Sequence, residues 1–89
     1  MFTSFGRETT RTYTASALTA ALDALNDSEA YGMVLRAKGI VAGENGQWLH
    51  FDYVPGEADV REGCAGVIGR LCVIGSGLNE EKLTALFNL

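Results

Sequence analysis

The sequence predicts an α+β domain: a small, mostly antiparallel sheet of four or five strands with two helices packed on one face. The expected order is strand, helix, four strands, helix. Short segments that alternate apolar and polar residues fill the middle of the chain, which is typical of strands with one buried face. Two segments nearer the ends repeat apolar residues every three or four positions, which is typical of amphipathic helices. No internal repeat or linker divides the 89 residues, so we expect a single domain over 1–89.

The first part of the chain predicts one strand and one helix. Residues 2–5 predict a short strand, and the polar run 7–11 predicts a loop. A helix is predicted from Thr14, a suitable N-cap, to about Asn26, where polar residues end the apolar pattern. The apolar residues that form one face of this helix are Ala15, Leu18, Leu22 and Leu25.

The middle of the chain predicts four further strands, at residues 33–41, 48–54, 57–61 and 67–74. The segment 57–61 is short and charged, so we expect it at an edge of the sheet. The segment 67–74 is rich in β-branched residues, so we expect it near the centre. The apolar faces of the first two of these strands consist of Leu35, Ala37, Gly39 and Val41 and of Leu49, Phe51 and Tyr53.

The turn at residues 44–46 determines how two of these strands pair. Asn45 and Gly46 favour a two-residue turn, but that register would set an apolar face beside a polar one. A three-residue loop closed by a bulge removes the conflict and leaves Gly46 in the left-handed conformation, which suits glycine. We therefore predict a positive φ at Gly46 and Lys38 opposite Asp52. The same register pairs Val41 with Leu49, Gly39 with Phe51 and Ala37 with Tyr53.

A second helix is predicted at the end of the chain. Asn79 suits the N-cap, and Glu80 and Glu81 suit the positive end of the helix dipole. Leu78 and Leu83 occupy the two positions of a hydrophobic staple. The predicted buried stripe consists of Leu83, Leu86 and Phe87.

Composition excludes several classes of partner. The net charge is −4 and the seven Lys and Arg residues form no run, which argues against nucleic acid. No apolar run approaches the roughly 20 residues needed to span a bilayer, and no signal peptide begins the chain, so we expect no membrane contact and a cytoplasmic location. We expect Cys64 and Cys72 to be buried thiols rather than a disulfide.

The sequence contains no recognisable catalytic motif. There is no P-loop for nucleotide phosphates, and His50 has no Ser or Cys arranged beside it as a nucleophile. We therefore expect no catalytic residue and no bound cofactor. Asp52 follows His50 on the same strand face, so these two, with a cysteine, are weak candidates for metal binding. The alternative interpretation of His50 is a partly exposed strand residue beside an aspartate.

Five residues of two neighbouring strands are expected on one face of the sheet: Arg36, Lys38, Trp48, His50 and Asp52. One interpretation is a solvated face with a stabilising pair between Lys38 and Asp52. The other is a contact surface, because a tryptophan flanked by arginine is typical of interface anchors. On that interpretation the interaction surface consists of Arg36, Lys38, Trp48 and His50.

Four motifs, in this order and spacing, resemble the C-terminal domain of CobW-type GTPases. They are Arg36-Ala37-Lys38-Gly39, Trp48-Leu49-His50, Gly69-Arg70-Leu71 followed by Ile74-Gly75, and Leu78-Asn79-Glu80-Glu81. The resemblance extends over nearly the whole chain, including the opening strand and the first helix.

The resemblance implies a non-catalytic domain. In that family this domain follows a P-loop GTPase domain, which contains the nucleotide site and the cysteine-rich metal motif. The chain is then expected to be a fragment of a longer GTPase. It would dock or regulate within a metal chaperone linked to cobalamin biosynthesis or metal delivery. The expected partners are the GTPase domain of the same chain and a metal-requiring client protein. The alternatives are a direct metal-binding domain and a free-standing interaction adaptor.

Overall fold

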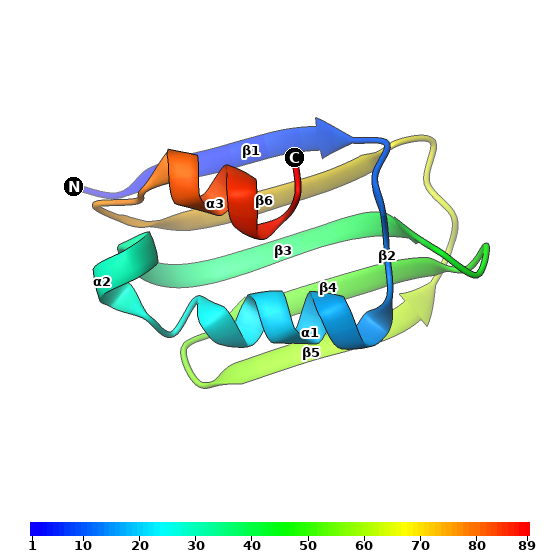
Figure 1. The fold of residues 1–89 in the computed structure, drawn as a ribbon, viewed down its shortest axis with the longest axis horizontal. Helices are drawn as coiled ribbons and strands as arrows, with labels where there is room; N and C mark the ends of the chain where they lie inside the picture. The colour runs from blue at the N-terminus through cyan, green and yellow to red at the C-terminus, as the bar shows by residue number, and fades with distance from the viewer.

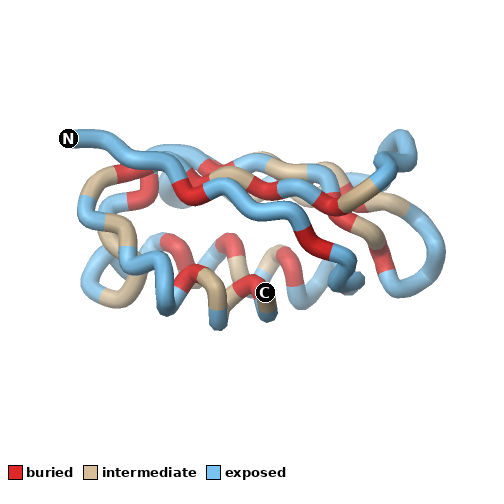
Figure 2. Tube along the Cα trace, turned by 90° about the horizontal axis from the view of Figure 1, so that it is seen from above, coloured by how far each residue is buried: buried red, intermediate tan, exposed pale blue.

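The computed structural model describes residues 1–89 and arranges them in two layers, a sheet and three helices that all lie on one side of it (Figures 1 and 2). The elements are β1 Thr3–Thr9, β2 Thr12–Tyr13, α1 Ala15–Ala24, α2 Ser28–Tyr31, β3 Met33–Gly43, β4 Trp48–Val54, β5 Glu57–Gly63, β6 Gly69–Ser76 and α3 Glu80–Leu86. None of the helices is long and apolar enough to span a membrane.

The sheet has the order β1-β6-β3-β4-β5, with every neighbouring pair antiparallel. The two-residue strand β2 adds a short parallel pairing with β3. This confirms the predicted α+β class, the helices on one face, the edge position of β5 and the interior position of β6. The sequence pattern did not reveal β2 or the four-residue helix α2, because both are too short to show a period.

The core lies between the two layers and contains 15 buried hydrophobic residues. Helix α1 and its C-cap contribute three predicted leucines, Leu18, Leu22 and the C-cap Leu25, while Ala15 is exposed at the first turn. From α3 and its C-cap come Leu83 and Phe87, both fully buried, whereas Leu86 is half-buried. The Phe87 ring stacks on Phe51 of β4, with centroids 6.4 Å apart. Each such side chain contributes roughly 1.5–3 kcal/mol on burial.

The hairpin between β3 and β4 has the predicted register. Lys38 lies opposite Asp52, and the apolar pairs Val41–Leu49, Gly39–Phe51 and Ala37–Tyr53 form as expected. The Gly43 amide donates to the Gln47 carbonyl over 2.7 Å, which closes the three-residue loop. Gly46 has a φ of 84°. The face on which each side chain of β4 lies is therefore fixed by the turn.

Three strand predictions were wrong in detail. The last strand was expected from residue 67, but β6 begins at Gly69 and Val67 is exposed. The run 7–11 was expected as a loop, but β1 continues to Thr9. Glu8 pairs with Arg70 on the neighbouring strand β6, and Thr9 is buried. Leu35 was expected on the core face, but a bulge between Val34 and Arg36 shifts the register. Val34 is buried in its place, and Leu35 is exposed.

Hydrogen bonds of two polar side chains, Tyr13 and Asn26, connect the helix layer to the sheet. The Tyr13 hydroxyl donates to the Phe87 carbonyl over 2.6 Å, at the end of α3. Burial raises the pKa of Tyr13, which keeps this donor protonated. Beyond the end of α1, the Asn26 side-chain oxygen accepts from the Tyr53 hydroxyl and from the Gly56 amide. The predicted N-caps are also confirmed, with Thr14 and Asn79 each accepting a backbone N–H of its helix.

Candidate functional site

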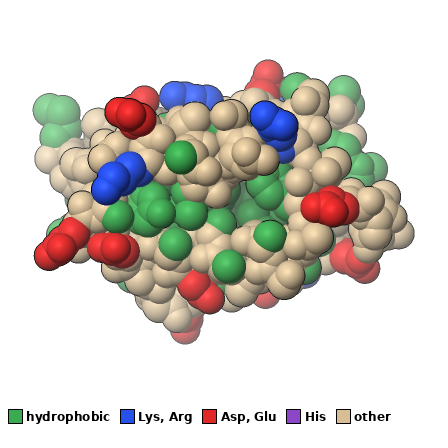
Figure 3. All heavy atoms as spheres, in the orientation of Figure 1, with side chains coloured by type: hydrophobic (Ala, Val, Ile, Leu, Met, Phe, Trp, Pro, Cys, Tyr) green, Lys and Arg blue, Asp and Glu red, His purple; other side chains and the backbone are tan.

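The helices leave one side of the sheet uncovered, and we call this side the open face (Figure 2). It consists of the outward side chains of five strands. These include Ser4, Gly6 and Glu8 of β1, Arg70, Cys72 and Ile74 of β6, Arg36, Lys38 and Ile40 of β3, Trp48, His50 and Asp52 of β4, and Asp59 and Arg61 of β5. Figure 3 looks onto the opposite side, where carboxylates lie around the rim of the helix layer.

Asp52 is the centre of an ion-pair network on the open face. One of its carboxylate oxygens accepts from Arg36 over 3.3 Å, and the other accepts from Arg61 over 3.0 Å. Arg61 also pairs with Asp59, over 2.7 Å. Desolvation would raise the pKa of Asp52, but the hydrogen bonds from Arg61 and Arg36 outweigh it and hold this pKa below its ordinary value. The carboxylate is thus strongly favoured in its charged form.

The predicted pair between Lys38 and Asp52 does not form, although the two residues are directly opposite. The forked guanidinium groups of Arg36 and Arg61 reach Asp52 instead, and each takes one oxygen. Lys38 makes no ion pair. It is the only Lys or Arg on the open face without one, because Arg70 pairs with Glu8 over 3.1 Å.

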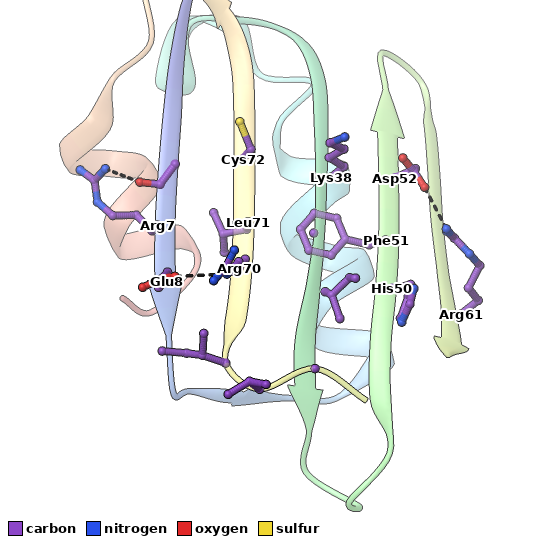
Figure 4. Close-up of a pocket in the computed structure, with 16 residues that line it drawn as sticks. Arg7, Glu8, Lys38, His50, Phe51, Asp52, Arg61, Arg70, Leu71 and Cys72 are labelled. Atoms are coloured by element: carbon purple, nitrogen blue, oxygen red, sulfur yellow. Dashed lines mark hydrogen bonds and ion pairs between the residues drawn. The ribbon is translucent and has the colours of Figure 1, made fainter. Parts of the chain in front are cut away.

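A hollow of about 820 Å³ lies over the middle of the open face, and Lys38 is among the residues that line it (Figure 4). It exists because Gly6 and Cys72, which lie in the same cross-strand row as Lys38, are small. Apolar atoms come from Ile40 and from Val67, in the loop between β5 and β6. The hollow therefore combines a free cation with apolar surface.

The segment after β5 folds back toward β4. The His50 ring nitrogen Nε2 lies 2.9 Å from the Cys64 carbonyl, at hydrogen-bond distance. His50 also lies flat against Gly63, since a Cβ at Gly63 would come within 2.6 Å of the ring. A Cβ at Gly66 would come within 3.2 Å of the Trp48 ring. These contacts hold both rings in place and leave Trp48 half-buried at one end of the open face.

The geometry offers little to a metal ion. No three His, Cys, Asp or Glu side chains gather closely enough to hold one. His50 uses Nε2 on a backbone carbonyl, and the Asp52 carboxylate is held by two arginines. Both cysteines are free, and the prediction that both are buried is wrong. Cys64 is exposed in the loop after β5, and Cys72 is half-buried on the open face.

The structure places all four residues of the predicted interaction surface, Arg36, Lys38, Trp48 and His50, on the open face. Their role in docking stays a prediction. Sequence reasoning missed Arg61 and Arg70, which complete the charge pattern on neighbouring strands. The alternation of Glu57, Asp59 and Arg61 was the available signal, because it places three charged side chains on one face of β5.

Comparison with known proteins gives the family and the fold. Two similar solved structures are the crystal structure of a Zn(II)-bound YjiA GTPase from E. coli, with 22% identity and a TM-score of 0.77, and that of a Zn(II)-bound triple mutant of the YjiA GTPase, with 22% identity and a TM-score of 0.79. Each match covers 98% of this chain but only 29% of the solved chain. Among curated proteins, none matches closely enough to indicate a relative. A family model, that of the cobalamin synthesis protein cobW C-terminal domain, matches residues 2–88. The chain therefore belongs to the family of cobW C-terminal domains.

Proposed function

We propose that this chain is the non-catalytic docking domain of a CobW-type, GTP-dependent metal chaperone, and that it contacts the GTPase domain or a client protein through the open face. One observation carries the proposal: the helices cover only one side of the sheet, and the uncovered side presents an ordered charge network around a hollow. Arginine and tryptophan side chains are typical of protein interfaces, and the open face carries both, with Trp48 half-buried at one end.

The wider role of the protein rests on its family. The chain spans less than a third of the solved GTPase chains it resembles, and its sequence has no P-loop. We infer that nucleotide hydrolysis and metal handling belong to another part of the protein. The metal is then cargo, delivered to a client or to cobalamin biosynthesis in the cytoplasm. This domain would hold no cofactor of its own.

The decisive experiment measures binding of the 89-residue chain to a P-loop GTPase domain from the same organism by isothermal titration. Trp48→Ala removes an aromatic ring from the open face, so it should weaken binding about tenfold or more if Trp48 is an anchor. Its thermal stability should fall much less than its affinity. Zinc or cobalt titrated into the chain alone should give no heat of binding.

Leu49→Ala is the matched control, because Leu49 is the next residue of β4 and is buried on the core face. It should lose about 2–5 kcal/mol of stability. Any Leu49→Ala protein that remains folded should keep the wild-type affinity. If Trp48→Ala loses stability and keeps its affinity, Trp48 is a packing residue and the docking proposal fails.

A further inference from the structure

We propose that the hollow binds an extended acidic segment of the partner protein, with one carboxylate held by Lys38 and a second carboxylate, two residues along, held by Arg70. This inference rests on the proposed function, because it names the chemistry of the partner that the open face would contact. Three features carry it: the charge of Lys38, the spacing of the two cations and the dimensions of the hollow.

The first feature is the unneutralised charge of Lys38. The residue directly opposite it on β4 is Asp52, and both carboxylate oxygens of Asp52 accept from Arg36 and Arg61. The Lys38 ammonium therefore has no carboxylate to receive its donors. A carboxylate from outside is the group that completes the site.

The second feature is the distance between Lys38 and Arg70. Lys38 pairs with Cys72 across β3 and β6, and Arg70 is two positions along β6 from Cys72. Such diagonal neighbours are about 7–8 Å apart. In an extended peptide, side chains two residues apart point the same way and are separated by about 6.6–6.8 Å. The pair between Arg70 and Glu8 is highly exposed, at 72% and 57%, so a ligand can displace Glu8 at small cost.

The third feature is the extent of the hollow. Its lining runs from Gly6 of β1 to Arg61 of β5, across four strand spacings, or about 19 Å. A small anion would contact only part of this surface. Ile40 and the fully exposed Val67 can receive an apolar side chain beside the carboxylates. A nucleic acid fits poorly, because the seven Lys and Arg residues of the chain form no run that could follow a phosphate backbone.

The test uses the isotope-labelled 89-residue chain and follows its backbone amide signals by NMR. The probe is the capped hexapeptide Ser-Val-Ser-Glu-Ser-Glu, in which the valine and both glutamates share one side when extended. Amide shifts are expected in residues 6–8, 38–40 and 70–72. Lys38→Gln should weaken binding about fivefold, as expected for loss of a partly exposed ion pair. Lys38→Arg should retain the affinity, and Lys82→Gln, on α3, should change nothing.

Several results would overturn the inference. One is equal binding by a peptide with glutamine in place of both glutamates. Another is a set of shifts confined to the helix layer. Glutarate that binds as tightly as the peptide would indicate a small-anion site rather than a peptide site. Because Lys38 is exposed, its variants should fold like the wild-type chain, and circular dichroism would verify this.

The same variants separate this inference from the proposed function. If Trp48→Ala weakens binding of the GTPase domain or client while Lys38→Gln does not, the docking face stands and the acidic segment is wrong. If neither variant weakens that binding, both proposals fail. If both variants weaken it and the glutamine peptide binds poorly, the acidic segment is supported.

Discussion

At the scale of single residues, the open face is organised by which cation reaches which carboxylate. Register places Lys38 directly opposite Asp52, yet Arg36 and Arg61 occupy both oxygens of that carboxylate. Backbone pairing fixes which residues are neighbours, but side-chain length and donor geometry decide which neighbours bond. This is why the strand pattern predicted the position of Lys38 and not its lack of a partner.

The lowered pKa of Asp52 gives a pH-dependent prediction. At neutral pH the carboxylate is charged in both the folded and the unfolded chain, and its two arginines stabilise the folded state. As the pH falls below about 4, the unfolded chain takes up the proton first, because its pKa is higher. The stabilisation by Asp52 should therefore be present above that range and be lost below it.

Urea unfolding of the wild-type chain and of Asp52→Asn between pH 7 and pH 3 would measure this effect. At pH 7 the variant should be less stable by under about 1 kcal/mol, as is usual for exposed pairs. The two curves should converge on acidification. A difference that grows as the pH falls would contradict the assignment of a lowered pKa.

At the scale of elements, the β3–β4 hairpin was predictable because only one register lets two apolar faces meet. The end of β1 was not predictable. Glu8 and Arg70 pair at exposed positions, so this part of the strand shows no alternation of apolar and polar residues. The bulge at Leu35 was hidden for a different reason. Val34 and Leu35 are both apolar, so the sequence does not show which of them faces the core.

The loop of this hairpin allows the strain of the left-handed backbone at Gly46 to be measured without a steric clash. A Cβ at Gly46 would meet nothing within 4 Å, so Gly46→Ala has no steric cost beyond its φ of 84°. We expect a loss of about 1 kcal/mol from the left-handed backbone. Gly6→Ala is the control, because its Cβ would also meet nothing and its φ is not positive. If Gly46→Ala and Gly6→Ala lower the free energy of unfolding in urea equally, the left-handed backbone at Gly46 is not the cause of the loss.

At the scale of the whole molecule, the two layers enclose one core, to which both helix α1 and the C-terminal α3 contribute. The predicted architecture is confirmed at this scale because it depends only on apolar periodicity. The hollow could not be predicted, because it arises from small residues on β1 and β6, which are adjacent in the sheet but far apart in the sequence.

One core predicts cooperative unfolding of the isolated chain. We expect a stability on the order of 5 kcal/mol, at the low end for small domains. Trp48 fluorescence and far-ultraviolet circular dichroism should give the same transition in urea. Separate transitions would mean that the helix layer and the sheet do not form one unit.

The absence of a P-loop from the sequence predicts that the isolated chain does not bind or hydrolyse GTP. A fluorescence titration with a labelled GTP analogue, with and without Mg²⁺, would measure this. The separately expressed GTPase domain serves as the positive control. Micromolar affinity of the chain alone would contradict the prediction.

The strict alternation along β4 has an evolutionary consequence. Leu49, Phe51 and Tyr53 are buried in the core, while the residues between them lie on the open face. A mutation at one of those intervening positions alters the open face without changing the volume of the core. If the open face docks a partner, as we propose, descendants of one ancestral domain can diverge in their choice of partner while they inherit the same architecture.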